Sequence, residues 1–422
     1  MSAAVPAARY ALFLLVFTAV LAFANRYVFT RSSTAFGWSP RTRKAVAWLF
    51  ATVLVTSFSG RVLELVWKSA PVGAVLTVAL TFELAVILSA AVLAIGDVSA
   101  LVFRRLRQRL TRDGEQPRGL AEPSVAEQDH TSDGELTRRS FLLQTGVGSA
   151  VLLGSSSALY GTLAGRHDYQ LHETVLKLPG LSSKLDGFCI AQLSDVHLGQ
   201  FVGEPELAAA LDLLQRAKPD LIVLTGDLLD HDIARAQMLG RFARRIASIA
   251  PHGVAAVTGN HDFYAGVDEV VDTLTSAGVR VLRNQGEVIG APDAGFALLG
   301  VDDEYGERIN RGPDLQQAIV SLPRLGGSVS AARDLPRVLL CHRPSFFERA
   351  SHYVALQLSG HTHGGQVNPL ITPASWVLPH GWVAGRYELN GSALYVNSGF
   401  GTVGPPARIG AAPEVTRIIL TS

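Results

Sequence analysis

The chain has 422 residues, of which 48% are hydrophobic and only 17% are charged, and its mean hydropathy is +0.25. This composition is unusual for a wholly soluble protein, and the length exceeds what one compact domain usually needs. The net charge of +1 gives no support for a nucleic-acid partner. Because the apolar residues crowd the first 165 positions, we expect a membrane part followed by a globular part.

Four long apolar runs precede the globular part. They cover residues 10–29, 45–67, 72–98 and 141–165. About 20 apolar residues suffice to cross the hydrocarbon core as a helix, so each run predicts a transmembrane helix, although Gly and Ser dilute the fourth. Glu83 lies inside the third run. It is either a functional carboxylate or, as we expect, a residue that faces a neighbouring helix or water.

The basic residues between these runs predict their orientation. The loop between the first and second runs and the loop between the third and fourth runs are basic, with Arg31, Arg41, Arg43, Lys44, Arg104, Arg105, Arg107, Arg109, Arg112, Arg138 and Arg139. The short loop between the second and third runs holds only Lys68. Since basic loops stay in the cytoplasm, the globular part is expected outside it.

The start of the fourth run, TRRSFLL, resembles a twin-arginine export signal through Arg138 and Arg139. An ordinary positive-inside anchor explains the same residues, and we expect an uncut anchor. The expected organisation is three transmembrane helices over 1–112, a polar cytoplasmic linker over 113–139, a fourth helix or signal-anchor over 140–165, and a catalytic domain over 166–422.

From residue 166 onward, short apolar runs alternate with helical patterns, which predicts a layered α/β domain. Strands are expected at 187–193, 220–225, 253–258, 279–282, 296–301, 337–341, 354–359, 393–397 and 415–420. Helices are expected at 204–217, 233–250 and 267–278. Cys189 and Cys341 both lie in apolar runs, which favours buried free thiols over a disulfide.

Five of the predicted strands are each followed by residues of the kind that bind metals. The segments are SDVHLG, GDLLD, GNHDF, HRP and GHTHGG, and they carry Asp195, His197, Asp227, Asn260, His261, His342, His361 and His363. Sites in open α/β folds form beyond the carboxyl ends of the strands. Imidazoles, carboxylates and an amide suit Mn, Fe or Zn better than Ca or Mg, and a carboxylate can bridge two such ions.

The order of these segments resembles the calcineurin-like metallophosphoesterase superfamily over Gly187 to Ile419, and most closely its membrane-anchored bacterial branch. The resemblance implies a two-sheet β sandwich flanked by helices, with two divalent or trivalent metal ions at one edge that activate a hydroxide. It implies that Asp195, His197 and His363 hold one ion, that Asn260, His342 and His361 hold the other, and that Asp227 bridges them. His261 is then the catalytic proton donor or charge stabiliser.

The resulting functional hypothesis is a membrane-anchored hydrolase of a phosphorylated small-molecule or lipid-linked substrate, acting on a phosphoester or pyrophosphate. One alternative is a UDP-2,3-diacylglucosamine-type pyrophosphatase, which an extracytoplasmic site disfavours. The others are a non-enzymatic membrane sensor or scaffold, and a transporter.

Several further residues near the motifs have open roles. Asp230, His231 and His252 either support the ligands or lie in solvated loops. Asp262 either orients His261 or is a turn carboxylate. Arg343 is a candidate contact for a substrate phosphate, and Arg408 is either such a contact or a surface arginine.

Overall fold

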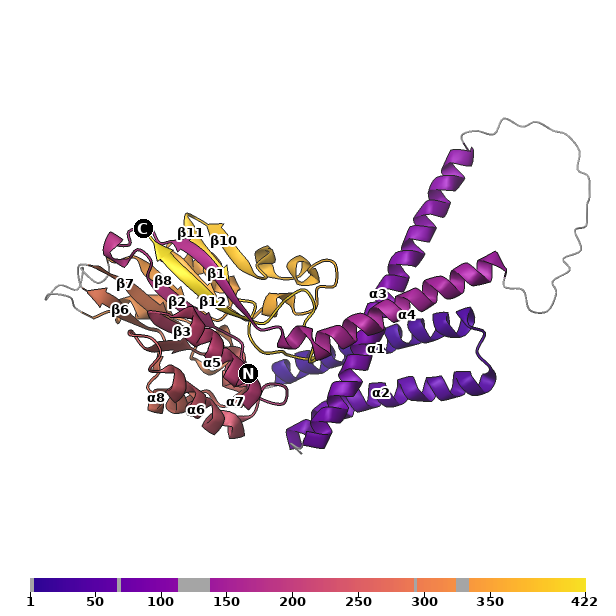
Figure 1. The fold of residues 1–422 in the computed structure, drawn as a ribbon, viewed down its shortest axis with the longest axis horizontal. Helices are drawn as coiled ribbons and strands as arrows, with labels where there is room; N and C mark the ends of the chain where they lie inside the picture. The colour runs from indigo at the N-terminus through magenta and orange to yellow at the C-terminus, as the bar shows by residue number, and fades with distance from the viewer. Residues whose placement is uncertain (1–3, 67–69, 113–136, 292–293, 324–333) are drawn as a thin grey trace, which may run out of the picture. The chain divides into compact units, whose positions relative to one another are not determined.

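A computed structural model of the chain describes residues 4–66, 70–112, 137–291, 294–323 and 334–422. The chain forms two compact units, Met1–Leu159 and Tyr160–Ser422, and the division between them falls inside helix α4 (Arg138–Leu163) (Figure 1). Most of the linker expected at 113–139 lies outside the described residues. Each unit is described below by itself.

The first unit is helical, and all four apolar runs form helices. Besides the larger part of α4, it contains α1 (Ala4–Ala35), α2 (Pro40–Val66) and α3 (Ala70–Arg112). α3 packs against both α1 and α2. α4 lies close to α3 at Gly154, where a Cβ atom would come within 2.3 Å of the Ser89 hydroxyl oxygen. Small residues of this kind allow helices to approach closely inside a bilayer.

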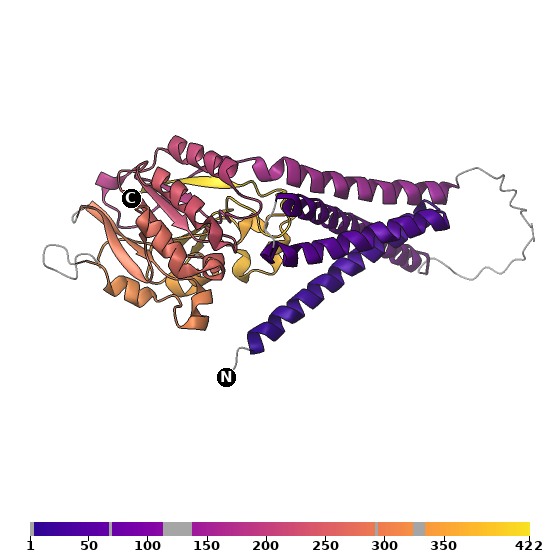
Figure 2. The same cartoon turned by 90° about the horizontal axis from the view of Figure 1, so that it is seen from below.

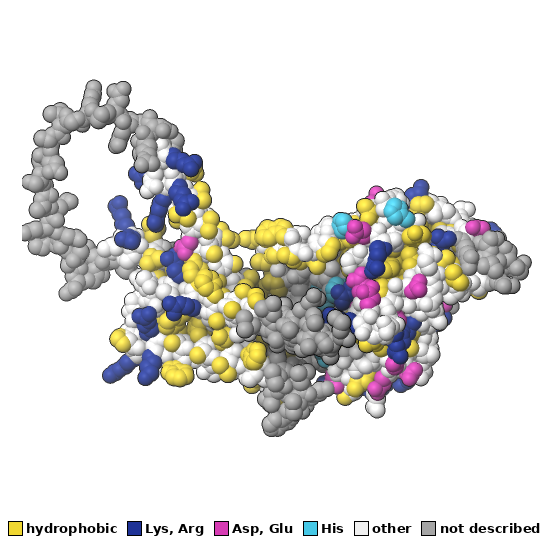
Figure 3. All heavy atoms as spheres, turned by 180° about the vertical axis from the view of Figure 1, so that it is seen from behind, with side chains coloured by type: hydrophobic (Ala, Val, Ile, Leu, Met, Phe, Trp, Pro, Cys, Tyr) yellow, Lys and Arg dark blue, Asp and Glu magenta, His cyan; other side chains and the backbone are white. Residues whose placement is uncertain are grey.

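The outer surface of the helical unit is apolar, as expected for a surface that faces lipid. Phe23, Trp48 and Val78 are each about two-thirds exposed or more. Figure 3 shows this hydrophobic surface, with the Lys and Arg side chains gathered toward one end of the unit. A buried polar contact lies inside, where the Asn25 amide donates to Glu83 Oε2 over 2.7 Å. Glu83 therefore faces a neighbouring helix, as expected.

Length and composition qualify two helical stretches of the described residues as candidate membrane spans, Pro71–Arg109 and Arg138–His167. Four membrane-spanning helices were expected from the sequence. All four helices are present in the structure. That α1 and α2 also cross the membrane remains a prediction from the sequence.

The second unit contains two six-stranded sheets, counted over the described residues. The first sheet has, in spatial order, β1 (Gln170–Lys177), β12 (Glu414–Thr421), β2 (Cys189–Leu193), β3 (Leu221–Thr225), β4 (Val254–Val257) and β5 (Arg280–Val281). The second has β10 (Gly385–Leu389), β11 (Ser392–Val396), β9 (Leu356–Ser359), β8 (Arg337–Leu340), β7 (Ala294–Gly300) and β6 (Gln285–Ala291). The two-sheet fold expected from the sequence is confirmed.

The central strands β2, β3 and β4 of the first sheet are buried on both faces. Successive residues of a strand point to opposite sides, so each of these strands contributes to two cores. Ile190 of β2 packs between the sheets against residues such as Phe296 and Leu358. Its neighbour Ala191 packs outward against the covering helices. These helices are α5 (Glu204–Ala217), α6 (Ala236–Ile246) and α8 (Val267–Ser276), and they lie along one side of the sheet (Figures 1 and 2).

The strand pairing brings the predicted motifs to one edge. β2, β3 and β4 pair in parallel, and β8 and β9 pair in parallel in the other sheet. The two sheets are joined at this edge by Gln192, whose amide donates to the Ser359 carbonyl oxygen over 2.9 Å. The loops after these five strands therefore meet at the ends of both sheets.

Candidate metal centre

The side chains predicted as metal ligands gather where these five loops meet. Two groups of three have ligand atoms that all lie within 4.8 Å of one another. The first group is Asp195, His197 and His363, and the second is Asp227, His342 and His361. Most of these side chains are buried, so the loops form a packed polar cluster.

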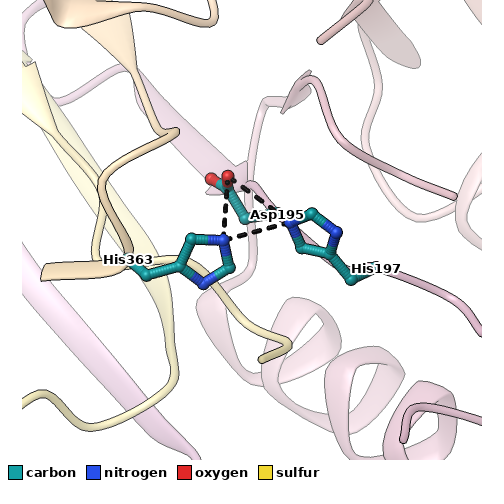
Figure 4. Close-up of side chains that lie close together, drawn as sticks. All are labelled: Asp195, His197 and His363. Atoms are coloured by element: carbon teal, nitrogen blue, oxygen red, sulfur yellow. Dashed lines mark hydrogen bonds and ion pairs between the residues drawn. The ribbon is translucent and has the colours of Figure 1, made fainter. Parts of the chain in front are cut away.

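The first group points its ligand atoms at a common position (Figure 4). His197 Nε2 and His363 Nε2 are 3.0 Å apart, and Asp195 Oδ1 lies 3.5 Å from His363 Nε2 and 4.0 Å from His197 Nε2. Bonds of about 2.1 Å to one ion place neighbouring ligand atoms at roughly this spacing. The three side chains come from loops after β2 and β9, which belong to different sheets.

The second group has a similar geometry. His342 Nε2 lies 3.2 Å from Asp227 Oδ2 and 3.1 Å from His361 Nδ1. Asn260, the remaining predicted ligand, is linked to the group through Arg343, whose guanidinium donates to Asn260 Oδ1 over 3.0 Å and lies 3.3 Å from His361 Nε2. The structure thus brings all seven predicted ligands to one place.

Asp227, a member of the second group, also lies close to the first group. Its Oδ2 atom is 3.6 Å from His197 Nε2 of the first group and 3.2 Å from His342 Nε2 of the second. A carboxylate in this position can serve as a ligand of two ions at once. The arrangement therefore fits a pair of cations that share one aspartate.

The backbone is strained at the predicted ligands. Asp195, His197, Asp227, His361 and His363 all have positive φ, between 48° and 73°. This left-handed conformation is uncommon outside glycine and costs on the order of 1–3 kcal/mol at each such residue. Residues in this conformation cluster at functional sites because the surrounding structure forces them into it.

Two glycines leave room for the ligands. A Cβ atom on Gly360 would stand 2.1 Å from Asp195 Oδ2, and one on Gly259 would stand 2.2 Å from Asp227 Oδ1. Any other residue at either position would displace the carboxylate. Gly360 of the GHTHGG segment and Gly259 of the GNHDF segment therefore allow their loops to approach the two carboxylates closely.

The electrostatics suit a cation. Burial lowers the pKa of His361 and His363 well below the ordinary imidazole value, so both rings are neutral and offer a lone pair. Burial also disfavours the Asp227 carboxylate, but the surrounding histidines, His342 foremost, together outweigh it and hold the Asp227 pKa well below its ordinary value. Burial lowers the pKa of His342, but the nearby carboxylates, Asp227 foremost, together outweigh this effect and raise the pKa to about 10. A metal ion would take the place of this proton.

His261 belongs to a third group, with His197 and Asp230, whose ligand atoms also lie within 4.8 Å of one another. Its Nδ1 atom lies 2.9 Å from Asp230 Oδ1, and its backbone N–H donates to Asp227 Oδ1 over 2.8 Å. Burial lowers the pKa of His261, but the carboxylates of Asp230 and Asp227 together outweigh this effect and the net shift is upward. Asp230 also lies 2.9 Å from His231 Nδ1, so Asp230 belongs to the site, whereas His252 lies apart against Phe188.

Asp262 does not orient His261. It is buried, and it accepts hydrogen bonds from the backbone N–H groups of Leu228, Leu229 and Gly259. Burial and then Asp227 raise its pKa to about 6. Asp262 therefore joins the loops after β3 and β4.

Arg408 is neither on the surface nor open to a substrate. It is 1% exposed, and its guanidinium donates to the carbonyl oxygens of Gly401, Ser398 and Ala411. Its Nη2 atom lies 3.3 Å from His363 Nδ1. Burial lowers the pKa of Arg408 to about 10. Arg408 thus holds its own loop together and supports the His363 ring.

Comparison with known sequences agrees with the family resemblance of the motifs. The family model for the calcineurin-like phosphoesterases matches residues 189–365. An uncharacterized metallophosphoesterase of Bacillus subtilis, YkuE, is 32% identical over 305 residues, which cover 68% of this chain and 99% of that protein. An uncharacterized metallophosphoesterase of Aquifex aeolicus is 33% identical over 274 residues, covering 64% of this chain and 97% of the relative.

A relative from Danio rerio, named a transmembrane protein with metallophosphoesterase domain, is 29% identical over 286 residues. The match covers 64% of this chain and 62% of that protein, so the chain spans less than two-thirds of this relative. Among solved structures, a dimetal phosphatase from Danio rerio aligns with a TM-score of 0.33 and 14% identity, covering 51% of this chain and 88% of the other.

Proposed function

The chain belongs to the calcineurin-like metallophosphoesterases, a family of phosphoester hydrolases, and we propose that it is a membrane-anchored member whose two-metal centre cleaves a lipid-linked or cell-wall-linked phosphoester or pyrophosphate outside the cytoplasm. The two-metal part of this proposal rests on the position of the Asp227 carboxylate, which lies close to histidines of both groups. One metal site would use Asp195, His197 and His363.

The second metal site would use Asn260, His342 and His361, with Asp227 shared. Nitrogen and oxygen donors without thiolate suit Mn, Fe or Zn, and the buried neutral imidazoles fit any of these ions. When bound, two such ions supply positive charge for the phosphoryl oxygens and make water more acidic.

The chain's own residues supply the proton and further charge. Asp230 engages Nδ1 of His261, which leaves His261 Nε2 to hold a proton for the oxygen of the leaving group. Arg343 is kept in place by Asp303, whose carboxylate accepts from Arg343 Nε over 2.8 Å. Its guanidinium, beside Asn260 and His361, would pair with a phosphate oxygen of the substrate.

Membrane anchoring is supported by several observations on this chain. Two stretches are candidate membrane spans by length and composition, the helical unit exposes apolar side chains, and its basic residues gather toward one end. The positive-inside rule then places the linker in the cytoplasm and the catalytic unit outside, with α4 as an uncut anchor. An anchored site favours substrates that themselves lie in or near the bilayer.

The test is metal-dependent hydrolysis by the purified full-length protein. We expect two equivalents of a transition metal per chain and turnover of bis(p-nitrophenyl) phosphate with Mn²⁺. Asp227→Asn should lose at least a hundredfold in kcat/KM, since removing one group that stabilises the transition state typically costs 10²–10³.

The matched control is Asp220→Asn, because Asp220 accepts a hydrogen bond from the Cys189 N–H at the opposite end of β2 and an amide oxygen can do the same. Absence of metal-dependent turnover in the wild type, together with no effect of Asp227→Asn on metal content, would favour a non-enzymatic sensor or scaffold.

A further inference from the structure

The loop that follows the GHTHGG segment is unusually apolar for a surface loop. Between His363 and Arg386 the sequence contains no Asp, Glu, Lys or Arg. Leu370 is 88% exposed, Val377 is 82% exposed and Trp376 is 74% exposed. Loops of soluble domains generally present polar residues to water, and a cluster of exposed apolar side chains marks an interaction surface. We call residues 369–378 the apolar loop.

The apolar loop is held at both ends, so its exposed side chains do not result from a loose segment. At its start, the Asn368 amide donates to the Gly364 carbonyl oxygen over 2.7 Å. Beyond its end, Trp382 is 6% exposed and packs with Phe347 and Leu394 in a small hydrophobic core. Two tryptophans six positions apart thus have opposite environments, one in the core and one in solvent.

The loop begins beside the segment on which α4 ends. The Asn368 N–H donates to the Ile409 carbonyl oxygen over 2.7 Å, and Val367 and Ile409 form a parallel bridge. On the other side, the Arg408 N–H donates to the Gly161 carbonyl oxygen near the end of α4. A Cβ atom on Gly161 would come within 2.7 Å of the Ile409 side chain, so this contact is close.

The last turn of α4 adds apolar side chains of its own. Tyr160 is 56% exposed and Leu163 is 72% exposed, and both belong to the same compact unit as the loop. If α4 crosses the membrane, these residues lie where it leaves the bilayer. Tyr and Trp are enriched at that depth because their rings combine an apolar body with a polar group.

We propose that the apolar loop inserts into the bilayer interface next to the exit of α4, and that it holds the metal centre at the membrane surface for a substrate with a lipid tail. This inference rests on the proposed membrane anchoring. A lipid surface is the occupant because the loop is uncharged and continuous, through Ile409, with the end of the proposed membrane helix. His363 precedes the loop by only six positions, so the phosphoester would be cleaved at headgroup depth.

The test places a fluorescent label on the loop of the full-length protein. Cys189 and Cys341 are buried free thiols, so a cysteine introduced at an exposed position is labelled selectively. The label is an NBD group on Val377→Cys, and Leu370→Cys provides a second position. The matched control is Thr275→Cys, an exposed polar position on α8. Each protein is placed in phosphatidylglycerol-containing nanodiscs with and without lipids that carry a doxyl quencher near the headgroup.

We expect the labels at 377 and 370 to lose most of their emission with the doxyl lipids, and the label at 275 to keep it. If the doxyl lipids quench the labels at 377 and 275 to the same extent, the proposal is overturned. It is also overturned if the emission at 377 is blue-shifted but the doxyl lipids do not quench it. The second result would show a protein surface covering the loop, either a second copy or the helical unit. The assay uses no substrate, so failure of the proposed hydrolysis would register separately, as inactive wild-type protein.

Discussion

Asp230 is the residue that we expect to control the protonation of His261. It lies within 2.9 Å of both His261 Nδ1 and His231 Nδ1, and it opposes the effect of burial on the His261 pKa. The sequence placed Asp230 three positions after Asp227 but did not show which way its side chain turns. That direction is decided where the loops after β3 and β4 meet, because Asp230 and His261 are 31 positions apart in the chain.

Replacing Asp230 with Asn should lower kcat by about tenfold to a thousandfold if His261 donates the proton, within the range that general acids contribute. The loss should also depend on pH. A donor must be protonated, so activity falls as the pH rises through the His261 pKa. Asp230 raises that pKa, and the substitution should therefore move the falling limb to lower pH.

The measurement is a kcat profile against pH with bis(p-nitrophenyl) phosphate. Asp212→Asn, which changes an exposed carboxylate paired with Arg216 on α5, is the matched control. An Asp230→Asn enzyme whose profile has the wild-type shape and position would show that His261 is not the proton donor.

The two cysteines allow a direct check of the buried environment. Burial raises the pKa of the Cys341 thiol, and Cys189 is also buried with a raised pKa. Since the thiolate is the reactive form, neither residue should react with Ellman's reagent in the native protein, and two thiols per chain should appear on unfolding without reductant. Thr275→Cys supplies a reactive reference. Absence of thiols after unfolding would indicate a disulfide instead.

At the scale of elements, Asp262 connects the loops after β3 and β4 through hydrogen bonds from their backbone N–H groups. Asp262→Asn keeps one acceptor oxygen but turns an amide NH₂ toward at least one backbone N–H that the carboxylate satisfied. A buried donor left without a partner costs about 1–3 kcal/mol. We expect that loss in the free energy of unfolding of the second unit, together with weaker metal binding.

Equilibrium unfolding of the full-length protein in detergent measures the first effect, and metal titration measures the second. Asp220→Asn is again the control, because only one of its oxygens accepts a backbone N–H among the described contacts. If both variants unfold at the same denaturant concentration, the hydrogen bonds of Asp262 between the two loops do not stabilise the unit.

Most of the strands that the sequence revealed are buried, although β5, predicted at 279–282, is a partly exposed edge strand. β2, β3 and β4 are fully buried apolar runs, and a run of that kind predicts a strand whatever surrounds it. β1, β6 and β10 were not predicted, and all three lie at sheet edges with partly exposed side chains. An edge strand needs less apolar sequence, so its pairing is decided by the partner strand.

The same reasoning explains what could be predicted of the site. The eight motif residues follow buried strands, and parallel pairing brings the ends of such strands together. Their assignment to particular ions stays a prediction. Arg408 was misjudged because a buried arginine that satisfies three carbonyl oxygens of its own loop has no local pattern in the sequence.

At the scale of the whole molecule, the basic ends of the helices predict where the catalytic unit lies. Alkaline phosphatase, which is active only outside the cytoplasm, should be active when fused after Ser422 and inactive when fused within 113–136. Replacing Arg104, Arg105 and Arg107 with Ser should weaken this orientation, because these charges lie at the end of α3 that we expect in the cytoplasm. An inactive fusion at Ser422 with an active one in the linker would reverse the topology.

The role of Arg138 and Arg139 separates an ordinary anchor from a twin-arginine export signal. Both residues begin α4, the first of them at its first position. An anchor needs only their positive charge, which Lys also provides, whereas a receptor that reads the arginine pair distinguishes the two side chains. We expect the double Arg138→Lys, Arg139→Lys variant to keep the Ser422 fusion active and uncut. Retention of the catalytic unit in the cytoplasm would instead show that the pair is an export signal, because positive charge alone would then be insufficient to send α4 across the membrane.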